Sequence, residues 1–408
     1  MTYGREPDDD RAAFQSAPRL LGRRAFLGEV GIGAAALALT ACTPSAPSGR
    51  TAATPAAASQ SEAWDRVVEA ARREGSVWIY GASIGRESSD ALVDPFEAAF
   101  PGVSVEGVFG PADQSIAKIT SERTAGRYLA DILIGPGSSG IPALKPLGVL
   151  APIKPTLMLP EVLDGAGWLD GHLWWIDAAE PYTALMYQGT IQPIVEYNTA
   201  MVPAGTFKSY WDLLDPRWKG RIVVADVTSG GSIQQLTFLY KHPDLGPGFL
   251  ERLFGEMSLT VSRDQRQSID WVAQGQYPVG LFLSSSQTIA AASQGLQIAI
   301  VPGYEFKEGA PLGAGGGAVM LIDRAPHPNA STLYLNWLLS RDGQSAWQKA
   351  TQQNSLRVDI PKDGLSPFTT PRPGGQYVNA GSEAFARIDD RTAAEVVNAL
   401  VVKALAQG

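Results

Sequence analysis

The chain has 408 residues, of which 45% are hydrophobic and 18% are charged, and its formal net charge is −8 at pH 7. That length suits two domains, each with a sizeable core. The acidic balance without basic runs argues against a nucleic-acid partner, and a single cysteine excludes a disulfide framework.

The N-terminus reads as an export signal. Arg23 and Arg24 precede a mildly apolar run from Val30 to Ala41, and the run closes on Leu39-Thr40-Ala41-Cys42. This ending resembles a bacterial lipobox, in which the thiol is acylated and the preceding peptide is removed. A transmembrane helix over 22–41 is the alternative, but the run is shorter than the about 20 apolar residues that a span needs. We therefore expect a twin-arginine-type lipoprotein signal peptide over 1–41.

Lipidation of Cys42 would tether the mature protein to the outer face of the cell membrane. Residues 43–61 carry no large apolar side chain. We interpret 42–61 as a flexible linker between the anchor and the folded part, and we expect regular structure to begin near Trp64.

The first folded stretch alternates between strands and helices. Strands are predicted over 77–82, 103–109 and 130–135, with helices over 87–100 and around Ile116 and Ile119. Short connections in this order predict a parallel sheet that is covered on both faces.

The middle of the chain is richer in strands, which are expected over 172–177, 183–188 and 193–198. Alternation then resumes, with strands over 222–226, 278–283, 296–301 and 318–322. Helices are expected over 231–240, 247–255, 266–274, 287–294, 328–340 and 383–405.

Two α/β blocks joined by two extended crossings predict an α/β fold with two lobes, a two-crossing hinge and an interlobar cleft. We expect lobe 1 to comprise 62–182 plus about 315–365. Lobe 2 would comprise 183–314 plus about 366–408. The role of the Pro- and Gly-rich stretch 355–381 stays open.

Small polar residues recur where predicted strands end, which is where open α/β sheets bind ligands. A helix start with serines or glycines can bind a polar group through its free N–H groups, although the same serines can simply cap the helix. Five aromatic residues, among them Tyr182, crowd the first crossing as core packing or as a ligand wall. The candidate ligand-binding residues from these patterns are Gly81, Ala82, Ser83, Ser138, Ser139, Tyr182, Ser229, Gly230, Gly231, Ser284, Ser285 and Ser286.

Catalytic and metal signals are weak. Residues 81–85 read GASIG and match the G-x-S-x-G pattern of hydrolases, with Ser83 as nucleophile. However, no strand precedes Val77 to supply an oxyanion loop, and neither His242 nor His327 has the setting of an oriented base. The three histidines lack paired spacing, so we expect neither a metal site nor a cofactor.

The chain resembles bacterial extracellular solute-binding proteins of ABC importers, closest to the branch of periplasmic ferric-iron-binding proteins. The most specific segment is SYWDLLDPRWKGRIVVADVTSGGS (209–232), and further matches are VWIYGAS (77–83), IVEYNTA (194–200) and HPNASTLYLNWLLSRDGQSAW (327–347). The resemblance covers roughly 75–400. It implies a type II periplasmic-binding-protein fold with ligand at the interface of the lobes and delivery to a membrane permease.

The resemblance also bears on the ligand. The iron branch uses a tyrosine pair, a histidine and a carboxylate, which would fall near Ser285 and Ser286, near Ile84, and near Ser138 or Ser139. None of these is a strong ligand for a hard trivalent cation. The positions beside the iron that hold an anion persist at Ser229, Gly230 and Ser284, and a nearby family position falls at about Arg263 or Asp264. An arginine there would suit a carboxylate, phosphonate or phosphate, or else be a solvated helix-start residue.

The sequence thus predicts a monomeric, lipid-anchored receptor that captures a small polar organic solute by closure and does no chemistry on it. We expect this solute to be anionic. One alternative is a ferric-iron or iron-chelate receptor of the same fold, with phenolate from Tyr182, Tyr187 or Tyr304. A secreted serine hydrolase that uses Ser83 is less favoured, and a sensor subunit is a further alternative.

Overall fold

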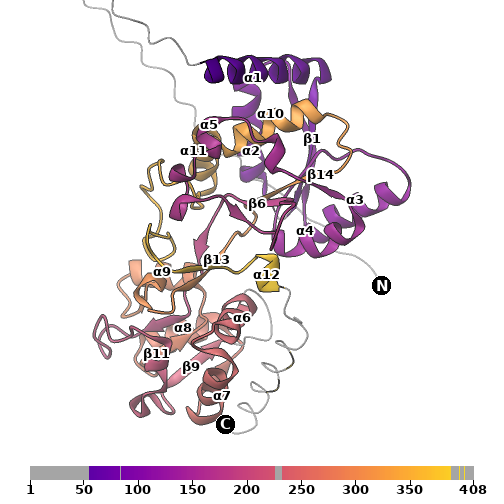
Figure 1. The fold of residues 1–408 in the computed structure, drawn as a ribbon. Coiled ribbons are helices and arrows are strands. Elements are labelled where there is room, and N and C mark those ends of the chain that lie inside the picture. The colour runs from indigo at the N-terminus through magenta and orange to yellow at the C-terminus, as the bar shows by residue number, and fades with distance from the viewer. Residues whose placement is uncertain (1–54, 83, 226–231, 387–394, 396–398, 400–408) are drawn as a thin grey trace, which may run out of the picture. The chain divides into compact units, whose positions relative to one another are not determined.

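A computed structural model describes residues 55–82, 84–225, 232–386, 395 and 399 (Figure 1). The predicted signal peptide and Cys42 lie outside the described residues, as do Ser83, Ser229, Gly230 and Gly231. Among the helices that are described, none has both the length and the apolar character to cross a bilayer.

The first sheet has seven strands, in which β1 (Ser76–Ala82) pairs in parallel with β2 (Ser104–Gly110) and with β3 (Ile132–Ile134). The predicted parallel arrangement is confirmed for these three strands. The other strands pair antiparallel: β14 (Ala318–Ile322), β6 (Ala184–Met186), β5 (Trp174–Trp175) and β4 (Leu150–Ala151). The first sheet thus contains both parallel and antiparallel pairs. One of its antiparallel strands, β14, joins it from a distant part of the chain.

Seven helices accompany this sheet in the described chain. They are α1 (Pro55–Glu74), α2 (Arg86–Ala99), α3 (Ala112–Thr124), α4 (Gly137–Leu144), α5 (Pro160–Leu163), α10 (Pro328–Leu339) and α11 (Arg341–Thr351). Residues 55–61, which we assigned to a flexible linker, thus belong to α1. Alanine-rich sequence with a proline in the first helical position favours this helix. The sequence pattern did not predict it because residues 55–61 contain no large apolar residues.

The second sheet has five strands, in the order β10 (Thr260–Ser262), β9 (Ile222–Ala225), β11 (Val279–Leu281), β8 (Val195–Tyr197) and β12 (Ala299–Ile300). Its helices are α6 (Ser232–Lys241), α7 (Gly246–Glu256), α8 (Gln265–Ala273) and α9 (Ser285–Ser293). All four lie within a few residues of their predicted bounds, since their apolar residues follow helical spacing.

A third, three-stranded sheet lies where the chain passes between the other two sheets. It contains β7 (Thr190–Ile191), β13 (Ala310–Gly313) and β15 (Tyr377–Asn379), and β13 pairs with both of the others. β7 leads into the second sheet and therefore lies in the first predicted crossing. β13 leads back to β14 and therefore lies in the second, here called the return crossing. Of the predicted helix over 383–405, the structure describes α12 (Glu383–Ala386) and the helical residues Glu395 and Ala399.

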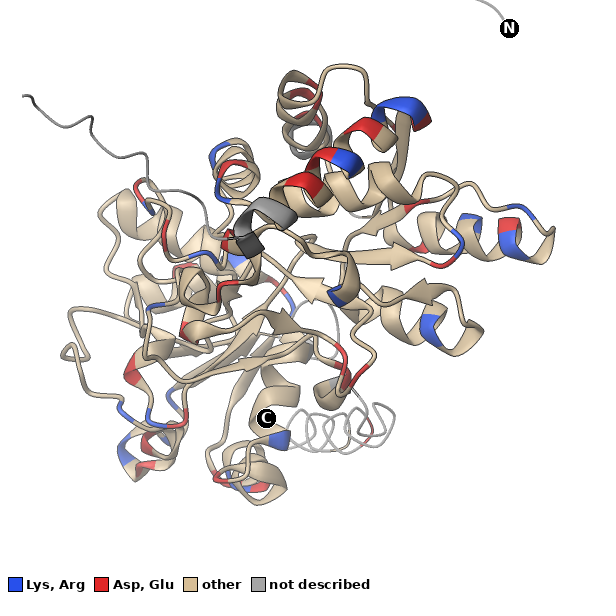
Figure 2. Cartoon of the chain, turned by 45° about the horizontal axis from the view of Figure 1, so that its top comes forward, with Lys and Arg blue, Asp and Glu red and all other residues tan. Residues whose placement is uncertain are grey.

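Two hydrophobic cores accompany the two larger sheets. The first core includes Ala184–Tyr187, Ile191 and Ala310, which our lobe boundaries placed in lobe 2. The two-lobe boundaries themselves stay a prediction. Charged residues occur mainly on helices and loops, and few of them lie on strands (Figure 2).

Candidate ligand-binding cavity

One of the described cavities, here called the main cavity, has a volume of about 610 Å³. Three stretches that are far apart in the sequence line it: 190–192, 232–289 and 352–370. The lining residues are Thr190, Ile191, Gln192, Ser232, Gln235, Gln265, Phe282, Leu283, Ser284, Ser285, Ser286, Gln287, Ile289, Gln352, Gln353, Asn354, Gly364, Leu365, Ser366, Thr369 and Thr370. Most of them are amides or alcohols, and none of these described residues carries a charge.

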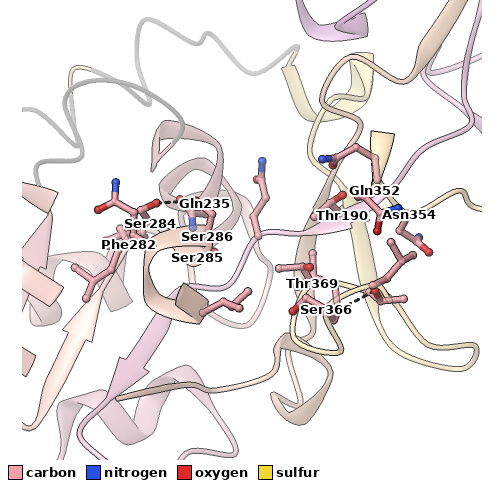
Figure 3. A pocket seen from close by; sticks show the side chains of 18 of the residues that line it. Thr190, Gln235, Phe282, Ser284, Ser285, Ser286, Gln352, Asn354, Ser366 and Thr369 are labelled. Carbon is pink, nitrogen blue, oxygen red and sulfur yellow. Dashed lines mark hydrogen bonds between the residues drawn. The ribbon is translucent and has the colours of Figure 1, made fainter. Parts of the chain in front are cut away.

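Two walls face each other across the main cavity (Figure 3). Gln235 and the serines Ser284–Ser286 lie on one side. Thr190, Asn354 and the stretch with Ser366 and Thr369 lie on the other. Hydrogen-bonding groups on α6 and at the start of α9, beside the second sheet, thus oppose two other segments. These are the first crossing, which contains Thr190, and residues 352–370, here called the C-terminal stretch.

The start of α9 forms the centre of the first wall. Ser284 is the N-cap residue, and no side chain caps this helix. The Ser284 N–H donates instead to Oε1 of Gln265 at 2.9 Å, and the hydroxyls of Ser284 and Ser286 lie 3.3 Å apart. The N–H groups of the next three residues have no acceptor within the helix, as at any helix start. They are donors for a ligand oxygen.

Phe282, just before the serines, has a left-handed backbone with φ 59°. This conformation is unfavourable for a bulky residue and is typical of functional sites and tight turns. The side chain is only 1% exposed, and the Phe282 N–H donates to the carbonyl of Ile194 at 2.9 Å. The strained residue is therefore held by packing and hydrogen bonding, and it directs Ser284 and α9 at the cavity.

Sequence reasoning missed the whole second wall. The C-terminal stretch reaches the cavity because Nδ2 of Asn354 donates to the carbonyl of Gly189 at 2.8 Å, and because the Ile191 N–H donates to the carbonyl of Thr369 at 2.8 Å. These residues follow neither helical nor strand periodicity. The Gln352-Gln353-Asn354 run after α11 was the one local signal that could have drawn attention to them.

A smaller cavity of about 310 Å³, here called the side cavity, adjoins the main one because Gln353 lines both. Its other lining residues include Ile84, Gln188 and Trp347. Nε1 of Trp347 donates to Oε1 of Gln188 at 3.2 Å. Since Ile84 follows β1, the loop after that strand does reach this region.

The structure brings together some of the predicted site residues and leaves out others. Ser284, Ser285 and Ser286 line the main cavity. Gly81 and Ala82 are buried at the end of β1, Ser138 and Ser139 are exposed in the first turn of α4, and Arg263 is exposed before α8. The ring of Tyr182 stacks on Trp175, with centroids 4.7 Å apart. None of these last six residues lines either cavity.

His327 is held more firmly than its sequence setting predicts. Nδ1 of His327 lies 2.8 Å from Oδ2 of Asp131, and the His327 N–H also donates to this carboxylate. His327 is therefore oriented, contrary to our expectation. Burial raises the pKa of Asp131, and the hydrogen bonds from Trp78 and His327 oppose that effect. The pair links β3 to the start of α10 and lines neither cavity.

Within the described ranges, no group of three or more His, Cys, Asp or Glu side chains converges as a metal site. Of the tyrosines considered for iron, Tyr187 is fully buried and its hydroxyl has no partner. Burial raises the pKa of Tyr187, so a phenolate at this position is disfavoured.

Residues 91–357 match the family model described as "Bacterial extracellular solute-binding protein". No curated protein matches the chain.

Several solved structures share the fold. A putative extracellular solute-binding protein from Bordetella parapertussis is 14% identical with a TM-score of 0.60, covering 81% of this chain and 99% of its own. The Trichodesmium protein IdiA (FutA), in complex with iron and citrate, is 18% identical with a TM-score of 0.57, over 80% and 99% of the two chains. Iron-bound HitA from Pseudomonas aeruginosa is 18% identical with a TM-score of 0.53, over the same shares. These likenesses show the α/β fold of periplasmic solute-binding proteins.

Proposed function

The chain belongs to the family of bacterial extracellular solute-binding proteins, and we propose that it is the solute-binding lipoprotein of an ABC importer. It captures a small polar solute in the main cavity and delivers this solute to a membrane permease. The protein does no chemistry on the solute.

The main cavity carries this proposal. Its walls come from the second sheet on one side and from the first crossing and C-terminal stretch on the other. A solute that bonds to both walls favours the arrangement in which they are close, because a ligand stabilises the state to which it binds better. Closure also excludes water and so strengthens each hydrogen bond. The permease would recognise the closed arrangement.

Two kinds of measurement test solute capture. Thermal-shift screening of small polar solutes, followed by calorimetry, should find one that binds with micromolar affinity, or about −8 kcal/mol. The variant Ser285→Trp should abolish that binding, since an indole in the first turn of α9 fills the cavity. Unchanged binding in this variant would place the solute elsewhere.

The lipid anchor is a separate part of the proposal, and it rests on the sequence around Cys42. Expression in the native host should place the wild type in the membrane fraction, with an N-terminal diacylglyceryl-cysteine detectable by mass spectrometry. Cys42→Ala should move the protein to the soluble exported fraction or leave it uncleaved. A Cys42→Ala variant that is processed and membrane-bound like wild type would contradict lipidation.

Iron is the second candidate cargo, and the fold shared with iron-bound proteins favours it. The residue types that line the main cavity oppose it, because amides and alcohols do not neutralise a trivalent cation. Addition of ferric citrate near neutral pH should give no phenolate-to-iron absorption band. A coloured complex would support the iron assignment over the organic solute.

A further inference from the structure

We propose that the main cavity takes an uncharged, polyhydroxylated solute, such as a sugar or polyol. This inference rests on the proposed function and names its substrate class. It departs from the anionic solute that the sequence predicts. Three features of the main cavity favour such a solute: oriented hydrogen-bond acceptors and donors, the absence of charge among the described lining residues, and the apolar surface between them.

The first determined acceptor is the side chain of Gln235. It is 7% exposed and lines the main cavity. Its Nε2 donates to the carbonyl oxygen of Pro193 at 2.5 Å. A carbonyl can only accept, so this contact determines which end of the amide is nitrogen. Oε1 of Gln235 has no hydrogen-bond partner among the described residues and is not one of the fully covered unpaired atoms, so it is an acceptor open to a ligand donor.

Asn354 repeats this pattern on the opposite wall. Its Nδ2 donates to the carbonyl of Gly189, which again determines the amide orientation, and the side chain is 5% exposed. Its Oδ1 is buried with no hydrogen-bond partner. An unpaired buried acceptor costs about 1–3 kcal/mol. Asn354 lines the main cavity, so a small shift of this covered side chain on solute binding would bring Oδ1 to a solute donor and remove that cost.

Donors face the same cavity. The first-turn N–H groups of α9 have no capping side chain and suit a ligand oxygen. The hydroxyls of Ser284 and Ser286 lie beside them and can donate or accept. A solute with hydroxyl groups satisfies donors and acceptors together, because each hydroxyl does both. An ionised carboxylate or a fully ionised phosphate group has only acceptors to offer and by itself would leave Gln235 Oε1 unpaired.

The lack of charged residues in the described lining also distinguishes between an uncharged and a charged solute. No Lys, Arg, Asp or Glu is among the described lining residues, and Arg263 is not one of them. An anion in the main cavity would lose its hydration without a cationic partner, and an unpaired buried charge costs several kcal/mol. A cation would likewise lack a carboxylate. An uncharged solute avoids this cost.

The apolar part of the lining suits the same solute. Phe282 and Leu283 line the cavity beside the serines, and Ile289 and Leu365 add to this surface. A sugar or polyol presents C–H groups between its hydroxyls, and these bury favourably against such side chains. Sites of this kind combine an apolar lining with a few oriented polar groups.

The test compares three classes of probe by thermal shift and calorimetry with the full chain. The first comprises neutral monosaccharides, disaccharides and polyols, the second citrate, sugar phosphates and phosphonates, and the third ferric citrate. We expect binding from the first class alone. Its affinity should change less than about twofold between low and high salt, because no ion pair is screened. Binding from the second or third class alone would overturn this inference and leave solute capture standing. Binding from no class would overturn both.

Substitution of Gln235 tests the acceptor directly. Gln235→Met keeps the shape and removes the amide, and we expect at least a tenfold weaker affinity for the neutral solute. Gln276→Met is the matched control, because Gln276 is exposed and lines neither cavity. The melting temperature without ligand reports any folding defect separately. Equal affinity in the wild type and in Gln235→Met would refute the assigned role of Gln235.

Discussion

Oε1 of Gln265 accepts a hydrogen bond from the main-chain N–H of Ser284 at 2.9 Å. The contact joins the first turn of α8 to the N-cap of α9, whose serines form one wall of the main cavity. Nε2 of the same amide lies 3.4 Å from the carbonyl oxygen of Phe282. One side chain therefore holds both flanks of the strained turn before α9.

Removal of this amide should loosen the binding wall. We expect Gln265→Ala to weaken solute binding about tenfold and to lower the free energy of unfolding by about 1 kcal/mol, since one part-buried hydrogen bond of 2.9 Å and a weaker one of 3.4 Å are lost. Calorimetry and chemical denaturation measure the two effects. Gln276→Ala is the control, because Gln276 is an exposed residue that follows the C-terminal end of α8. If both variants bind like the wild type, the Gln265 contact does not organise the site.

Glu196 on β8 is fully buried, and its Oε2 accepts only a 3.4 Å hydrogen bond from the Leu283 N–H. Burial raises the pKa of Glu196 well above its usual value. The folded state therefore holds a proton that the unfolded state releases above its own pKa of about 4.3. From there up to the folded pKa, the free energy of unfolding falls as pH rises, by at most about 1.4 kcal/mol per pH unit.

Glu196→Gln should remove this fall in the free energy of unfolding with rising pH. We expect nearly equal stability of the variant and the wild type near pH 4, and a growing advantage of the variant towards pH 8, as measured by chemical denaturation. Glu106→Gln, at an exposed position on β2, is the control. Parallel pH profiles for Glu196→Gln and the wild type would show that Glu196 does not titrate in this way.

The buried hydroxyl of Tyr187 makes no hydrogen bond to any described residue, and the ring packs edge-on against Trp347. Tyr187→Phe should therefore leave the free energy of unfolding unchanged or raise it by up to about 1 kcal/mol, because an unpaired polar group is removed. Tyr334→Phe is the matched control, since that hydroxyl donates to the carbonyl of Leu92 at 2.9 Å. This second variant should lose about 1–3 kcal/mol. A Tyr187→Phe variant that loses as much would mean that the hydroxyl has a partner.

Gly317 lies between β13 and β14, and its backbone closely approaches the side chain of Gln188. Its carbonyl accepts from the N–H groups of Tyr187 and Gln188, and a Cβ at this position would overlap the side chain of Gln188. Gly317→Ala should lower the free energy of unfolding by about 1–3 kcal/mol. Gly255→Ala on α7, where a Cβ meets nothing within 4 Å, should be neutral or stabilising by up to about 1 kcal/mol. Equal melting temperatures for the two variants would contradict the packing argument.

The α/β order and most elements could be predicted from the sequence, because buried strands such as β1 and β11 and helices such as α10 have clear apolar patterns. The serines at 284–286 could be placed for the same reason, since they follow a strand. Short strands such as β7 and β13 were missed because they carry no pattern of their own.

The opposite wall could not be predicted, because Asn354 meets Gly189 across 165 residues of sequence. Gln235 and Gln265 drew no attention either, since glutamine in a helix is usually a surface residue. Their roles arise from carbonyl and N–H partners that become neighbours only in the fold.

The most direct test of the account is a pair of titrations by calorimetry, with the wild type and Ser285→Trp, using the neutral solute that gives the largest thermal shift. The account predicts a saturable, salt-insensitive isotherm for the wild type and no heat of binding for the variant, which should melt within a few degrees of the wild type. Equal isotherms for the two proteins would contradict it, because the solute would then bind outside the main cavity.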